Sequence, residues 1–302
     1  MRARAAAGAL WLGAVWFGAC ATQAGRLDGD TFETRKKLAR ELERRGEWAP
    51  AFSYADQLHR ERPRDPETLV LRGTIYRERG MWAEAETDLL DALKLNDASP
   101  EAHSALGILY DVTFRAGLAE PQHRAAVKLA PDVGSYHNNL GFSLFLRGKH
   151  RDAIAEYEKA ASLDPMSRRV RTNLGFAFAA NGDHRRAAHE FEMGGTAAEA
   201  KNNLGFAYER RGDLPRAYDL YLEATSLDPK STHARSNLVH AAQVLGKPVP
   251  LTVVSETTAG APPAPVLVEP TAPALPFVGP PPPSSAPSPK TVPTPLQKDV
   301  RP

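Results

Sequence analysis

The sequence has few of the features that mark cross-linked or nucleic-acid-binding proteins. Among its 302 residues there is one cysteine, Cys20, which can form no internal disulfide and cannot supply a multi-cysteine zinc site. The formal net charge is only +2, and leaving out Arg2 and Arg4 of the leader reduces Lys+Arg from 38 to 36, equal to the 36 Asp+Glu. A neutral chain has no general attraction for phosphate backbones, which disfavours a basic nucleic-acid binder.

The motifs of common catalytic sites are also missing. The sequence contains no H-E-x-x-H, no P-loop and no G-x-S-x-G. Its nine histidines are scattered, and His184 and His189 are five residues apart, which is the wrong phase for one helical face. Carboxylate pairs such as Asp152 and Glu156 are typical of a solvated helix face. We therefore expect no metal, no cofactor and no enzymatic activity.

No hydrophobic run is long enough to indicate a confident membrane span. Ala5–Phe17 holds 13 apolar residues and glycines, whereas a spanning helix needs about 20, so this run is typical of a signal peptide. The small residues before Cys20 resemble a bacterial lipobox, in which the cysteine is acylated. We expect a lipoprotein signal peptide over 1–19, lipidation at Cys20 and a linker over 20–30. An ordinary secretory signal with an incidental cysteine is the alternative.

Glycines recur at a fixed interval through the middle of the chain. The interval is 34 residues three times and then 30, through Gly73, Gly107, Gly141, Gly175 and Gly205. An alanine follows each glycine after 12 residues, and a proline or aspartate follows it after 24 in four of the five units. This pattern resembles the tetratricopeptide repeat (TPR), which implies an all-α, right-handed superhelix of about six helical hairpins and a capping helix.

The repeats divide the chain into an ordered body and a tail. We expect the solenoid over 31–247 and a disordered, proline-rich tail over 248–302, because 17 of the 26 prolines lie after Lys247. The tail is either a solubilising linker or a docking segment for a partner. The expected repeats cover residues 32–65, 66–99, 100–133, 134–167, 168–197 and 198–231, with a cap over 232–247.

The repeated small residues predict how each hairpin is built. The repeat glycine and alanine are expected where two antiparallel helices cross closely, and turn glycines such as Gly148 are expected to end the first helix in a left-handed conformation. The third repeat lacks a turn glycine, and Pro121 predicts that its second helix begins late, at that proline. The shortened fifth repeat predicts a second helix that ends at Gly194-Gly195 after about two turns.

Two columns of side chains recur on the first helix of each repeat. An asparagine stands two residues before the glycine and a phenylalanine one residue after it. Because first helices line the inner wall of such a superhelix, the carboxamides are candidates for holding an extended backbone and the phenylalanines for apolar pockets. Hydrogen bonds between repeats and filling of space between helices are the alternatives. The candidate peptide-binding residues are Asn139, Asn173, Asn203, Asn237, Phe142, Phe176 and Phe206.

A narrower resemblance comes from several features together. The lipobox, the N-N-L-G-F cores and the shortened fifth repeat followed by A-A-E-A-K-N-N-L-G resemble the TPR lipoproteins of tight-adherence (Tad/Flp) pilus assembly. That resemblance implies a lipid-anchored periplasmic scaffold that binds a pilus or secretion component. Ala21, in place of an aspartate after Cys20, implies sorting to the outer membrane. An adaptor or regulator of peptidoglycan enzymes in the envelope is the alternative.

Overall fold

The computed structural model describes residues 32–249, and this part of the chain is helical with no strand. The expected signal peptide, Cys20 and nearly all of the proline-rich tail lie outside the described residues. No helix within 32–249 has the length and apolar character needed to cross a membrane. The all-α solenoid expected from the repeats is confirmed.

The helices form six hairpins and a closing helix. A first helix over residues 32–44 pairs with α2 (Trp48–Glu61). The next five hairpins are α3 (Pro66–Glu78) with α4 (Trp82–Leu95), α5 (Pro100–Val112) with α6 (Ala116–Leu129), α7 (Gly134–Leu146) with α8 (His150–Leu163), α9 (Arg168–Ala180) with α10 (His184–Gly194), and α11 (Ala197–Arg210) with α12 (Leu214–Leu227). The helix α13 (Thr232–Leu245) follows them.

Local chemistry sets where several first helices begin. Asp65 accepts a hydrogen bond from the backbone N–H of Thr68 at 2.8 Å, and proline follows it as the first residue of α3. Ser99 caps α5 in the same way, again before a proline. Such side chains satisfy backbone N–H groups that have no partner within the helix, and proline has no N–H to satisfy.

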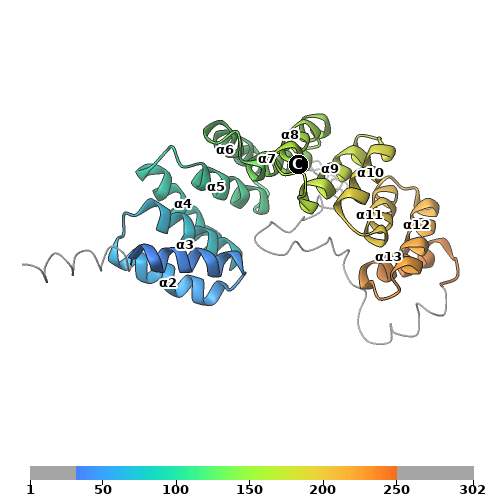
Figure 1. Ribbon diagram of the computed structural model, residues 1–302, viewed down its shortest axis with the longest axis horizontal. Coiled ribbons are helices and arrows are strands. Elements are labelled where there is room, and N and C mark those ends of the chain that lie inside the picture. The colour runs from blue at the N-terminus through green and yellow to red at the C-terminus, as the bar shows by residue number, and fades with distance from the viewer. Residues whose placement is uncertain (1–31, 250–302) are drawn as a thin grey trace, which may run out of the picture.

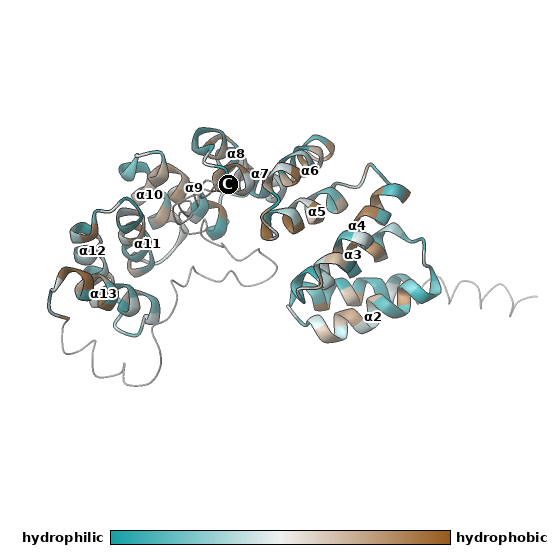
Figure 2. Ribbon diagram, turned by 180° about the vertical axis from the view of Figure 1, so that it is seen from behind, coloured by the Kyte–Doolittle hydropathy of each residue, from teal (hydrophilic) through white to brown (hydrophobic). Residues whose placement is uncertain are grey.

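The hairpins lie side by side in an arc (Figure 1). Each first helix from α3 to α11 packs on the next first helix as well as on its own hairpin partner. The second helices, by contrast, pack mainly on the helices next to them in sequence. The first helices therefore converge on the inner side of the arc while the second helices spread on the outer side. Figure 2 shows apolar and polar residues alternating around the helices, as expected where each helix buries one side.

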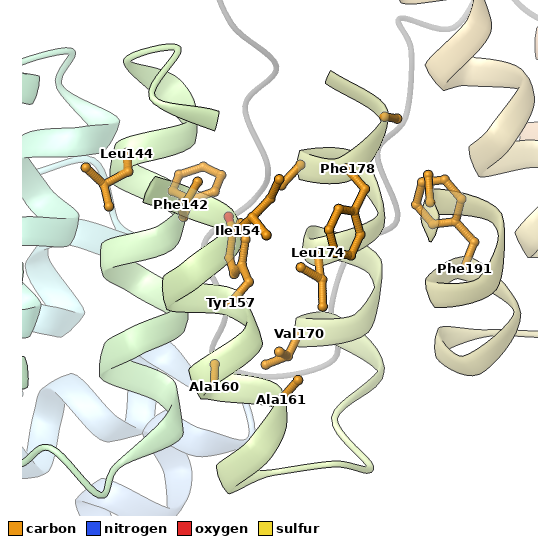
Figure 3. Packing of buried hydrophobic residues seen from close by; sticks show 14 of the residues in the cluster. Phe142, Leu144, Ile154, Tyr157, Ala160, Ala161, Val170, Leu174, Phe178 and Phe191 are labelled. Atoms are coloured by element: carbon orange, nitrogen blue, oxygen red, sulfur yellow. The ribbon is translucent and has the colours of Figure 1, made fainter. Parts of the chain in front are cut away.

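The repeat glycines lie where the two helices of a hairpin cross, as expected. A Cβ atom on Gly175 would lie 2.6 Å from Cε1 of Phe191, and one on Gly141 would lie 2.9 Å from Cδ1 of Tyr157. Both rings are buried. The core continues from one hairpin to the next, and Figure 3 shows side chains of α8, among them Tyr157, meeting Leu174 of α9.

The expected late start of the third repeat's second helix is wrong. The helix α6 begins at Ala116, and Pro121 lies inside it. A proline removes one N–H donor, and the carbonyl that this donor would reach belongs to Gly117 in the exposed first turn, where water can replace the bond. Burial of Ala119 and Glu120 holds the first turn in place. Tertiary packing thus outweighs the local preference of proline.

The fifth repeat ends where its glycines indicated. The helix α10 finishes at Gly194 and has 11 residues, which makes three turns, not the expected two. Thr196 then starts α11 with a capping box, in which its side chain bonds the backbone N–H of Glu199 and the Glu199 side chain bonds the backbone N–H of Thr196. This reciprocal pair replaces the four residues that the repeat has lost.

Phe114 takes the left-handed conformation that glycine takes in other hairpin turns. Its φ is +58°, against +74° at Gly80 and +72° at Gly148, and its side chain is 67% exposed. Because this conformation costs a non-glycine residue about 1–2 kcal/mol, we expect Phe114→Gly to raise the free energy of unfolding by about 0.5–1 kcal/mol, measured by urea denaturation. Leu118→Gly, at an exposed helical position nearby, should lower it. No gain for Phe114→Gly would contradict the strain.

Candidate functional site in the inner layer of first helices

The asparagine column forms hydrogen bonds from one hairpin to the one before it. In each bond the Nδ2 group donates to a side chain that lies three residues before the preceding repeat's glycine. The bonds join Asn139 to Ser104 Oγ at 3.1 Å, Asn173 to Asn138 Oδ1 at 3.0 Å, and Asn237 to Asn202 Oδ1 at 2.9 Å. These donors therefore hold successive first helices together.

Three of these hairpins share a continuous hydrogen-bonded chain. Asn138 Nδ2 donates to Asn139 Oδ1 at 3.4 Å, which connects the bond from Asn173 to the bond that ends on Ser104. Asn203, the fourth member of the predicted column, is buried. The structure thus gives the column a role between repeats, and contact of these asparagines with a bound peptide stays a prediction.

The phenylalanine column belongs partly to the core and partly to the inner surface. Phe142 is buried, whereas Phe176 and Phe206 are half-buried. The rings of Phe176 and Phe206 meet edge to face with centroids 6.0 Å apart, and Phe176 also packs on Phe191 at 4.8 Å. The column therefore supplies a partly exposed apolar strip, and its role as a peptide pocket stays a prediction.

A further column, which the sequence reasoning missed, lies four residues before the repeat glycine. His137 Nε2 lies 2.9 Å from the backbone oxygen of Pro131, and His137 Nδ1 lies 2.7 Å from Glu156 Oε2. His137 thereby joins the turn before its own helix to the second helix of the hairpin. The equivalent contacts join His103 to Asp97 and Gln122, and Arg171 to Pro165 and Glu190. The 34-residue spacing of His103, His137 and Arg171 is the signal that identifies this column.

A buried polar cluster links the third and fourth hairpins. His123 lies over Gly107, at the position where Tyr157 and Phe191 lie in the next two hairpins. Its Nε2 is 2.9 Å from Asp111 Oδ2, and Ser143 Oγ donates to Asp111 Oδ1 at 2.9 Å. All three residues are buried, so the cluster joins helices and offers no group to solution. No group of three or more His, Cys, Asp or Glu placed to hold a metal occurs within 32–249.

Two histidines at the starts of second helices make stability depend on pH. Burial lowers the pKa of His150, and burial together with the charges of Arg211 and Arg216 lowers the pKa of His184. Arg211 Nη1 also donates to His184 Nε2 at 2.8 Å, a bond that protonation of this nitrogen would remove. Because the unfolded chain then binds protons first, we expect the free energy of unfolding to fall as pH drops below about 6.5.

Urea denaturation at a series of pH values checks this expectation. The matched variant is His184→Leu, because Leu214 begins the second helix of the next hairpin at the equivalent position. The variant should lose less stability than the parent between neutral and mildly acidic pH. An identical pH dependence in the two proteins would show that His184 does not contribute.

Comparison with known proteins agrees with this architecture. Residues 143–182 match a family model described as TPR repeat, and residues 198–231 match one described as tetratricopeptide repeat. The chain is similar to the solved structure of PilF from Pseudomonas aeruginosa, with 15% identity over 72% of this chain and 98% of that chain and a TM-score of 0.56. No curated protein matches the chain.

A second solved structure shows the same fold. It is a tetratricopeptide repeat protein from Parabacteroides merdae ATCC 43184, with 16% identity over 70% of this chain and 84% of that chain and a TM-score of 0.51. The helix pairs and the matched segments define the chain as a TPR solenoid, a class of scaffold that binds other proteins. It contains tetratricopeptide repeats and has the tetratricopeptide fold.

Proposed function

We propose that this chain is a scaffold without enzymatic activity that binds an extended segment of a protein partner along the inner layer of its fourth to sixth hairpins. One observation carries this proposal: apolar side chains stay partly exposed there. Leu146, Phe176 and Phe206 are half-buried, and Ala180 is exposed at the end of α9. At the corresponding positions of the first hairpin stand Arg40 and Arg44. An apolar strip beside polar groups suits the alternating side chains of an extended peptide.

We further propose that the scaffold is lipid-anchored through Cys20 at the outer membrane, faces the periplasm and assists assembly of a Tad/Flp-type pilus or secretion system. The support is the sequence: the lipobox, the N-N-L-G-F cores and the shortened fifth repeat together. The likeness to PilF, at 15% identity, supports the fold alone. Labelling cells with a radioactive fatty acid tests the anchor. Equal labelling of the parent and Cys20→Ala would end it.

A large side chain placed on the inner layer tests the binding surface. Ala180→Arg puts a long, charged side chain beside Phe176, and Ala155→Arg is the matched change at an exposed position of α8, in the outer layer. In cells deleted for this gene, the Ala155→Arg protein should restore surface pili and the Ala180→Arg protein should not. Circular dichroism should show equal helicity in both.

The two parts of this proposal fail separately. Normal pili with Ala180→Arg would remove the inner layer from the mechanism. Normal pili in the deleted cells would remove the role in pilus assembly, and co-purification with peptidoglycan enzymes would then favour the envelope adaptor.

A further inference from the structure

Arg169, the second residue of α9, shares a helix face with residues of the proposed binding surface. Positions four, seven and eleven residues apart lie on one side of an α-helix, which groups Arg169 with Asn173, Phe176 and Ala180. Asn173 donates to the preceding first helix, and the Phe176 ring contacts Phe206 of the following one. The face that carries Arg169 is therefore the inner face of α9.

The charges next to Arg169 are paired, and Arg169 is not. Arg168 Nη2 lies 2.6 Å from Glu199 Oε2, and Arg171 Nη1 lies 2.9 Å from Glu190 Oε2. No carboxylate oxygen among residues 32–249 lies within 4.0 Å of a side-chain nitrogen of Arg169. Burial lowers the pKa of Arg169, against the opposing influence of Asp164.

The equivalent position in the first three hairpins is acidic, and there the charge is used within the fold. Glu33 lies 3.1 Å from Lys36 Nζ, and Glu67 lies 3.1 Å from the same nitrogen. Glu101 forms a side-chain hydrogen bond with Tyr136. Arg169 thus reverses the sign of this column and makes no such contact.

A partly desolvated guanidinium without an anion destabilises the fold, because it loses hydration and gains no ion pair. A carboxylate restores that loss, since it accepts two parallel hydrogen bonds from the planar guanidinium. We infer that Arg169 is a specificity-determining residue that pairs with a carboxylate of the bound segment, while an apolar side chain of that segment packs beside Phe176. This inference rests on the proposed function.

The mode differs from a carboxylate clamp. A clamp needs lysines at the position that Ser104, Asn138 and Thr172 occupy. Here a single arginine lies one helical turn from that position, at the edge of an apolar strip. It requires an acidic group next to an apolar side chain and does not require a free C terminus.

Selection from a random short-peptide library, displayed with blocked C termini, tests the inference on the full chain. The parent protein should select peptides with Asp or Glu beside a large apolar residue. Arg169→Gln should lose the acidic preference and keep the apolar one, and Arg169→Glu should select Lys or Arg instead. The matched control is Arg151→Glu, at an exposed position of α8 in the outer layer, which should select as the parent does.

A resynthesised acidic peptide then gives the size of the effect. Its dissociation constant should rise about tenfold for Arg169→Gln, as for loss of one charge-assisted hydrogen bond. Changing the peptide's Glu to Gln should weaken binding to the parent and should not weaken it further for Arg169→Gln. The urea midpoint of Arg169→Gln should equal or exceed that of the parent, because the side chain has no structural partner; a lower midpoint would assign Arg169 to the fold.

The outcomes separate this inference from the proposed function. Apolar peptides without acidic residues, selected equally by the parent and Arg169→Glu, would overturn the inference and leave peptide binding intact. If Ala180→Arg abolished that apolar selection, the inner layer would still be the binding surface. Failure of the parent to select any peptide would overturn both.

Discussion

Replacing Asp111 with alanine is expected to lower the free energy of unfolding by about 3–5 kcal/mol, because His123 and Ser143 would then be buried without a hydrogen-bond partner. Asp111 accepts from Ser143 at 2.9 Å and lies 2.9 Å from His123 Nε2. The carboxylate joins α5 to α6 within its own hairpin and to α7 of the next one. Its loss should therefore destabilise the junction between the third and fourth hairpins, measured by urea denaturation.

A double variant separates the polar contact from the packing. The neighbouring hairpins place apolar or aromatic residues at these two positions, so Asp111→Leu with His123→Phe exchanges the pair for apolar side chains. Because removing both partners of a buried polar pair is often close to neutral, the double variant should recover most of the stability that Asp111→Ala loses. A loss as large as that of Asp111→Ala would show that side-chain shape, and not the polar pair, stabilises the junction.

Replacing Phe191 with alanine is expected to cost about 3–5 kcal/mol, because the ring is buried and its removal leaves a cavity between α9 and α10. The ring covers Gly175, where a Cβ would lie 2.6 Å from Cε1, and it also packs on Phe176. Thermal unfolding followed by circular dichroism gives the change. A cost below about 1 kcal/mol, the range of surface substitutions, would contradict this packing.

The same ring explains why glycine occupies position 175. In the parent, Gly175→Ala should destabilise by about 1–3 kcal/mol through overpacking, although alanine is the better helix former. With Phe191→Ala as the background, Gly175→Ala should be neutral or should stabilise by up to about 1 kcal/mol, because the clash is gone and the helix preference remains. Equal costs in the two backgrounds would exclude a contact between the two positions.

Much of the hairpin architecture could be predicted because its packing is local. Gly175 and Phe191 are 16 residues apart, within one hairpin, and every hairpin repeats this relation. A residue that must be small recurs wherever two helices cross closely, so periodicity alone locates the crossing. The same local reasoning failed at Pro121, since burial of the helix that contains it outweighs the preference of proline for a first turn.

The candidate site could be predicted only in outline. The columns that contain Asn173 and Phe176 were visible as repeated letters, but their partners were not. Asn173 bonds Asn138 of the preceding hairpin, and the repeated letters do not distinguish this bond from one to a peptide. The column that contains His137 was missed because its histidines and arginine differ in type while making equivalent contacts.

The sequence by itself determined that this protein is a stack of helical hairpins, because a fixed spacing of small residues reports contacts between helices that follow each other in the chain. Only the tertiary structure decided which polar groups are used inside the stack and which remain available. Asp111 and Ser143 are 32 residues apart, and the pairing of Arg168 beside the unpaired Arg169 depends on where Glu199 of the next hairpin lies. Hydrogen bonds and ion pairs require approach within a few ångströms, which the relative placement of neighbouring hairpins sets.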